Sequence, residues 1–169
     1  MVGLRSAPPP AATVVRTWTL ADFAELRQLR ADLRHALDAQ ALIPGKELDD
    51  LAERMSIVAT ELATNALNHA RSEALVQLSR TKRTLVLDVA DELPSVPPRL
   101  VEKPTPGSGG RGLRITQELA LDAGWYTADR RKHVWAQFGI PRRKRLFHTP
   151  RIPVSGLTTF VRLLRRMRH

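Results

Sequence analysis

The sequence predicts an α+β protein in which helices cover one face of a mostly antiparallel sheet. Two observations indicate this class: apolar residues recur at helical spacing in two long segments, and two pairs of short strand-like segments flank polar turns. The order along the chain is β-α-α-β-β-loop-α-β-β, which is typical of a two-layer α/β sandwich. A chain of 169 residues is long enough for one domain with a buried core.

The first half of the chain predicts one strand and two helices. Residues 14–20, VVRTWTL, are rich in β-branched and aromatic side chains and predict a strand. Asp22 and Glu25 resemble a capping box, and leucines at helical spacing follow them. A second helix is predicted from about residue 46 to residue 70, and its apolar stripe consists of Leu51, Met55, Val58 and Leu62.

Two hairpins are predicted in the second half. Residues 74–79 and 84–91 predict two strands around the turn RTKR, and Leu85, Leu87 and Val89 alternate in the second of them. Residues 125–128 and 133–140 form a second such pair around DRRK. Antiparallel strands that are close in sequence pair readily, so the two hairpins are expected to build most of the sheet.

A long loop and a third helix separate the hairpins. Residues 94–110, PSVPPRLVEKPTPGSGG, contain too many prolines and glycines for regular structure. Residues 111–124, RGLRITQELALDAG, predict a helix with Gly124 as its C-cap.

Positive charge is concentrated in the C-terminal tail. The net charge is +10, but residues 130–169 hold 12 of the 27 basic residues and no acidic residue, which leaves −2 for residues 1–129. The charge therefore says nothing about what the main body binds. A short amphipathic helix is predicted in the tail from Leu157, Phe160, Val161, Leu164 and Met167. Docking, disorder, an anionic membrane, an acidic partner and nucleic acid all remain open for this tail.

The second predicted helix ends in a cluster of polar residues. ELATNALNHA places Glu61 and Asn65 one turn apart beside the apolar stripe, and Asn68 and His69 follow them. Such half-buried polar residues either cap a structural element or face a cleft. A solvated helix end and a ligand site are both consistent with this spacing.

Two further features are suited to nucleotide binding. Asp91 ends a central strand, and GSGGRGL at 107–113 opens the third helix, where free backbone N–H groups can bind phosphate. The glycines could also form a simple hinge. Together with the helix cluster, they describe a pocket with a carboxylate for the adenine amino group and an asparagine oxygen for Mg²⁺.

These three motifs resemble those of the Bergerat-fold ATPases, the family shared by gyrase, heat-shock chaperone, histidine kinase and mismatch-repair proteins. The resemblance is closer to the stand-alone anti-sigma-factor serine kinases of actinobacteria. ELATNALNHA is similar to the first motif of that family, VADELP to the second and GSGGRGL to the third, and KHVWAQF is similar to the last strand. The resemblance covers residues 14–139.

The resemblance implies a role for each matched residue. Glu61 would be the catalytic base, Asn65 would hold Mg²⁺, and Asp91 would bind adenine. The residues under the ATP phosphates would be Gly109, Gly110, Arg111, Gly112 and Leu113. One departure concerns the second motif, where much of the family has glycine two positions after the aspartate and this chain has Leu93, followed by Pro94.

The implied function is that of an ATP-binding anti-sigma factor with serine/threonine kinase activity toward an anti-anti-sigma partner. A sensor histidine kinase is disfavoured, because the chain has no room for a helical hairpin that carries a phosphorylated histidine. The first alternative is a kinase-dead switch that binds ATP and a protein partner. The second is a nucleic-acid or membrane adaptor that acts through its basic tail and has a vestigial nucleotide site.

The sequence also leads to expectations about organisation. Residues 1–13 are expected to be a disordered leader, residues 14–139 the ATP-binding domain, and residues 140–169 the basic tail. The absence of cysteine excludes disulfides and thiol-ligated metals. The N-terminus lacks the layout of a secretory signal, so a cytoplasmic protein is expected. Its partners would be a sigma factor, an anti-anti-sigma factor or both, and a homodimer is possible.

Overall fold

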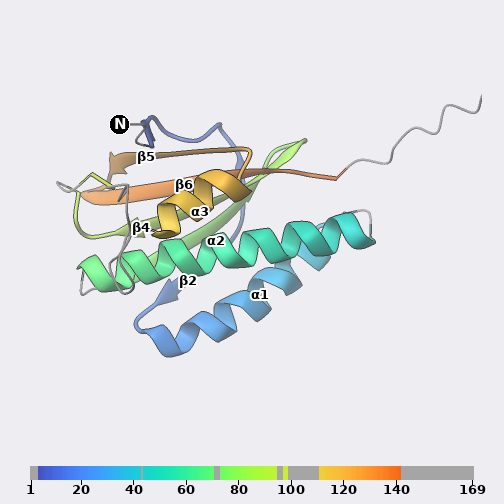
Figure 1. The fold of residues 1–169 in the computed structure, drawn as a ribbon, viewed down its shortest axis with the longest axis horizontal. Coiled ribbons are helices and arrows are strands. Elements are labelled where there is room, and N and C mark those ends of the chain that lie inside the picture. The colour runs from blue at the N-terminus through green and yellow to red at the C-terminus, as the bar shows by residue number, and fades with distance from the viewer. Residues whose placement is uncertain (1–3, 43, 71–72, 95–96, 99–110, 142–169) are drawn as a thin grey trace, which may run out of the picture.

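The computed structural model describes residues 4–42, 44–70, 73–94, 97–98 and 111–141 (Figure 1). The predicted α+β fold is confirmed: a mixed six-stranded sheet packs against a layer of helices. The elements are β1 Arg5–Ser6, β2 Thr13–Leu20, a 3₁₀ turn Phe23–Glu25, α1 Leu26–Asp38, α2 Lys46–Ala70, β3 Ala74–Arg80, β4 Thr84–Asp91, α3 Arg111–Leu119, β5 Asp122–Ala128 and β6 Arg131–Gly139.

The strands follow the spatial order β1-β5-β6-β4-β3-β2. β1 pairs with β5 in parallel, and the other neighbouring pairs are antiparallel. The two predicted hairpins, β3–β4 and β5–β6, join along β4 and β6, whose register pairs Leu87 with Ala136 and Asp91 with Lys132. β4 therefore lies inside the sheet, and its C-terminal end is flanked by β6.

The hydrophobic core lies between the helices and one face of the sheet, here called the helix face. β4 contributes Leu85, Leu87 and Val89 to it, because alternate residues of a strand point to the same side. α2 crosses β3, β4 and β6, and α1 packs against α2 and β2 (Figure 1). In the described part of the chain, no helix combines the length and apolarity that a bilayer span requires.

The start of α1 follows the predicted capping chemistry. The side chain of Asp22 accepts a hydrogen bond from the Ala24 N–H at 2.7 Å, and Glu25 accepts one from the Ala21 N–H at 2.6 Å. These carboxylates satisfy backbone donors that have no partner within the helix. A short 3₁₀ turn separates the cap from α1.

The N-terminal segment differs from the expected disordered leader. Leu4 is only 7% exposed, and Arg5–Ser6 add a short strand to β5. The indole Nε1 of Trp135 donates to the Ala7 carbonyl at 2.7 Å. The expectation of disorder is therefore wrong for residues 4–7. A proline-rich composition does not indicate which contacts a segment makes with residues far away in the sequence. The domain boundaries themselves stay a prediction.

Gly124 is not the C-cap of the third helix. α3 already ends at Leu119, and Gly124 lies within β5. A β-carbon at this position would lie 2.8 Å from the Trp135 ring and 2.9 Å from the Arg5 carbonyl oxygen. Glycine is needed there because β1 and an indole approach the backbone of β5 closely.

The turn of the second hairpin is shorter than DRRK. Asp129 and Arg130 have φ values of 48° and 61°, which is the left-handed conformation of a tight two-residue hairpin turn. The next two residues, Arg131 and Lys132, consequently belong to β6. This extension moves Lys132 from a predicted turn into the sheet.

Several predicted features lie outside the described residues. They include Gly109 and Gly110, nearly all of the predicted loop at residues 94–110, and the amphipathic helix of the tail.

A second polar cluster occupies the face of the sheet opposite the helices, here called the far face. Asp88 accepts a hydrogen bond from the Tyr126 hydroxyl at 2.7 Å and lies 2.8 Å from Nδ1 of His133. The rings of Tyr126 and His133 stack with centroids 4.6 Å apart. Burial and the bond to Asp88 raise the pKa of Tyr126 above its ordinary value of 10.0.

Gly124→Ala is expected to destabilise the fold by about 1–3 kcal/mol, because the added methyl group would overlap Trp135 and the Arg5 carbonyl. Urea denaturation followed by circular dichroism measures this loss. Gly139→Ala is the matched control, since a β-carbon there meets no atom within 4 Å. Equal stability of the two variants would contradict the packing argument.

Tyr126 is expected to make stability sensitive to alkaline pH. Because the folded state raises its pKa, the stabilisation is complete below pH 10.0 and is lost as the pH rises above that value. Tyr126 is the only tyrosine, so phenolate absorbance in the near ultraviolet reports on it alone. Tyr126→Phe should show a weaker loss of stability above this pH. Ionisation at the ordinary pKa in a protein that stays folded would refute the assignment.

Candidate functional site

The polar turn of α2 borders the hydrophobic core. Glu61 and Asn65 are half-buried, whereas Asn68, further along the helix, is exposed. Their neighbours Leu62 and Ala66 are 3% exposed and belong to the core. This alternation follows from the helical period, and it directs Glu61 and Asn65 to the edge of the buried stripe rather than to open solvent.

α3 lies along this edge of α2 and runs antiparallel to it. At the C-terminal end of α3, Nη1 of Arg54 donates to the Leu119 carbonyl at 3.3 Å. At its N-terminal end, a β-carbon on Gly112 would lie 2.8 Å from Oε2 of Glu61 and 3.1 Å from Nδ2 of Asn65. The structure therefore brings together three of the predicted site residues, and glycine at position 112 permits the close approach.

The N-terminus of α3 provides backbone donors beside these side chains. The first N–H groups of a helix have no partner within it, and the helix dipole places partial positive charge there. Arg111 is exposed, while Leu113 is 5% exposed and belongs to the core. The side chain of Leu113 therefore packs in the core and does not face a ligand. The hydroxyl of Thr116 bonds to the Gly112 carbonyl at 2.8 Å, which orders this turn.

Asp91 lies at the C-terminal end of β4, on the helix face of the sheet. Its side chain is 6% exposed. Oδ1 accepts a hydrogen bond from the Leu93 N–H at 2.9 Å, so the carboxylate also shapes the start of the following loop. In the described residues, the non-glycine positions with positive φ are Ala41, Asp129 and Arg130. Leu93 therefore replaces the family glycine without strain in its own backbone.

A buried lysine, which sequence reasoning missed, contacts Asp91. Nζ of Lys132 lies 3.0 Å from Oδ2 of Asp91, and the Lys132 side chain is 7% exposed. The polar run DRRK predicted a turn that included Lys132, so this residue was not considered part of a strand. The available signal was the alternation of β6: Lys132 precedes Val134, Ala136 and Phe138 at every second position, and those three residues lie in the core.

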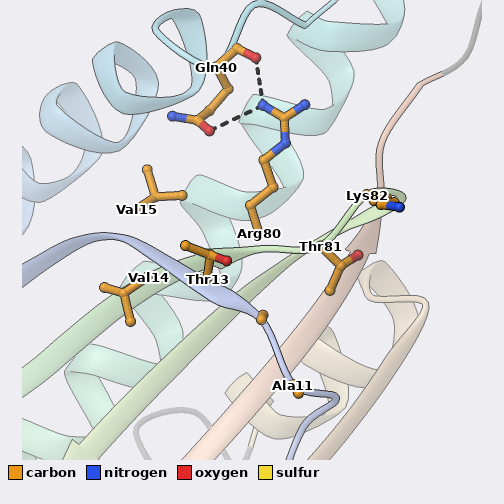
Figure 2. A pocket seen from close by; sticks show the side chains of 9 residues that line it. Ala11, Thr13, Val14, Val15, Gln40, Arg80, Thr81 and Lys82 are labelled. Carbon is orange, nitrogen blue, oxygen red and sulfur yellow. Dashed lines mark hydrogen bonds between the residues drawn. The ribbon is translucent and has the colours of Figure 1, made fainter.

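A pocket of about 1000 Å³ lies at the other end of the sheet (Figure 2). There, Nη1 of Arg80 donates to the backbone and side-chain oxygens of Gln40 at 2.6 and 3.2 Å. The pocket is lined by Ala11, Ala12, Thr13, Val14, Val15, Gln40, Arg80, Thr81 and Lys82. It contains none of the predicted site residues and is separated from Asp91 by the length of β4.

The candidate site thus combines a buried carboxylate, a half-buried glutamate–asparagine pair and the N-terminus of a helix. α2 packs against both β4 and α3, so these groups lie on one side of the sheet. A carboxylate can accept from a base, backbone N–H groups can bind phosphate, and an amide oxygen can bind Mg²⁺. The residues present therefore suit a Mg²⁺–nucleotide complex.

Comparison with known proteins agrees with this geometry. Residues 19–138 match the family described as the histidine kinase-like ATPase domain, and the match contains all three motifs. Comparison with curated proteins gives no match. The family match covers more than half of the chain and confirms the Bergerat-type ATPase fold. The chain belongs to the histidine kinase-like ATPase domain family.

Proposed function

We propose that the protein is an ATP-binding regulator, similar to an anti-sigma factor, that phosphorylates a serine or threonine of an anti-anti-sigma partner. The observation that carries this proposal is the contact of Glu61 and Asn65 with Gly112 at the N-terminus of α3. It joins a carboxylate, an amide and phosphate-binding donors in one place. The family match supports the ATP-binding part of the proposal.

Each described residue would hold a different part of the nucleotide. Asp91 accepts a hydrogen bond from the adenine amino group, because its carboxylate lies buried at the end of β4. The first backbone N–H groups of α3 donate to phosphate oxygens. Asn65 would supply an amide oxygen to Mg²⁺, and the metal ion would neutralise the charge of the phosphates.

Glu61 is placed to act on the attacking hydroxyl. It is half-buried, and its carboxylate approaches the backbone at Gly112, where the phosphates would bind. A carboxylate there orients the serine hydroxyl of the partner and accepts its proton as the oxygen attacks the γ-phosphorus. The bond between the γ-phosphorus and the β–γ bridging oxygen breaks, and ADP leaves.

A switch that binds ATP without transferring phosphate is the second candidate. The specific observation in its favour is that Leu93 and Pro94 follow Asp91 where much of the family has a glycine-containing turn. Both residues are half-buried, and the Leu93 N–H donates to the Asp91 carboxylate. In this case ATP would control partner binding alone. The adaptor function of the basic tail stays a third proposal, and residues 142–169 lie outside the described chain.

Mg²⁺-dependent ATP binding should require Asn65. Calorimetric titration with ATP in the presence and absence of Mg²⁺ is expected to show tighter binding with the metal. Asn65→Ala should lose this difference, because it removes the amide oxygen beside the phosphate site. Asn68→Ala is the matched control, since it removes the same group from an exposed position of the same helix. Absence of binding at millimolar ATP would sink the proposal.

Glu61→Gln is expected to separate the kinase from the switch. The amide keeps the shape of the side chain but cannot accept the hydroxyl proton, so phosphate transfer should fall by about 10²–10⁴-fold while ATP affinity changes little. Transfer of labelled γ-phosphate to a panel of anti-anti-sigma proteins measures this effect. Partner binding that depends on ATP without any transfer by the unaltered protein would favour the switch instead.

A further inference from the structure

The ion pair of Lys132 and Asp91 has no part in the function proposed so far. The two side chains are 7% and 6% exposed, and Nζ lies 3.0 Å from Oδ2. The residues face each other directly across the β4–β6 ladder. A buried ion pair often stabilises a protein no more than apolar residues of similar volume would. A contribution to stability therefore does not explain a buried lysine at this position, and a role in ligand binding explains it better.

The position of Lys132 in β6 defines where its charge lies. It occupies the same face of the strand as Val134, Ala136 and Phe138, which pack in the core. Unlike them, it stands at the end of the sheet where β4 stops at Asp91 and the loop toward the nucleotide site begins. The ammonium is thus held next to the carboxylate that is proposed to bind adenine.

We infer that Lys132, together with Asp91, recognises the nucleobase through hydrogen bonds. This inference rests on the proposed ATP binding. An ammonium has three N–H donors, and the bond to Asp91 uses one of them. The carboxylate has about four acceptor positions. The Leu93 N–H and Lys132 account for two of these contacts. Among the residues that the structure describes, an acceptor position of Asp91 therefore remains unused beside unused donors of Lys132.

Adenine offers the complementary pair. Its exocyclic amino group donates, and the adjacent N1 accepts. With the amino group on Asp91, N1 can accept from Nζ of Lys132. Guanine presents the reverse order, because its O6 accepts and its N1–H donates. In the same orientation guanine would set O6 against the carboxylate and N1–H against the ammonium, and buried mismatches of this kind strongly disfavour binding.

Two ATP analogues test the contact on the unaltered full-length protein. In 1-deaza-ATP a CH group replaces N1, whereas 7-deaza-ATP carries the same change away from this edge of the base. Calorimetry with Mg²⁺ is expected to show binding of 1-deaza-ATP about tenfold or more weaker than that of ATP, as for the loss of a hydrogen bond to a charged group. Binding of 7-deaza-ATP should equal that of ATP.

Lys132→Met should remove this discrimination, because it keeps the aliphatic stem and deletes the donor. ATP and 1-deaza-ATP would then bind equally, and the preference for ATP over GTP should also fall. Lys132→Arg retains a donor and should restore part of the preference. Because the methionine variant leaves Asp91 without its cation, circular dichroism is used to check its fold, while the analogue comparison on the unaltered protein needs no variant.

Two results would overturn the inference alone: equal binding of ATP and 1-deaza-ATP by the unaltered protein, or tighter ATP binding by Lys132→Met. The second result would mean that the lysine competes with adenine for Asp91. Failure of the unaltered protein to bind ATP at all would overturn the proposed function and this inference with it. The two failures are therefore distinguishable.

Discussion

The burial of α2 against the sheet is the interaction on which the rest of the structure depends. Its apolar stripe of Leu51, Met55, Val58 and Leu62 is at most 3% exposed and packs toward β3, β4 and β6, whereas Ile57 on another face of the helix is 39% exposed. Each large apolar side chain buried in this way contributes roughly 1.5–3 kcal/mol. The packing fixes the rotation of the helix about its axis. Glu61 and Asn65 are consequently held at the edge of the core, where an unattached helix would leave them in solvent.

The close approach of α3 depends on a missing side chain. Gly112 allows the first turn of α3 to contact the polar turn of α2, and any β-carbon there would overlap the Glu61 carboxylate. The Arg54 bond to the other end of α3 keeps the two helices aligned. A helix N-terminus binds anions through its unpaired N–H groups, and here it lies beside the Asn65 amide that is proposed to bind Mg²⁺.

The two aspartates of β4 have different roles because of the strand period. Asp88 and Asp91 are three residues apart, so their side chains point to opposite faces of the sheet. Asp88 joins Tyr126 and His133 on the far face. Asp91 lies on the helix face with Lys132. The sheet thus keeps the polar cluster of the far face apart from the candidate nucleotide site, and Asp91 is the carboxylate of β4 that faces this site.

Local periodicity in the sequence determined the fold class, the bounds of α2 and most of each hairpin strand, while motifs that resemble those of a known family led to Glu61, Asn65, Asp91 and Gly112 as candidate site residues. Those features depend on residues within a few turns of one another or on short motifs. Tertiary structure alone decided three other features: the packing of residues 4–7, the requirement for glycine at position 124, and the ion pair of Lys132 with Asp91. Each arises from contacts between segments far apart in sequence. The placement of Lys132 in β6 also depends on a two-residue turn. Asp129 and Arg130 have positive φ in this turn, a conformation that non-glycine residues rarely adopt and that their residue types therefore do not predict.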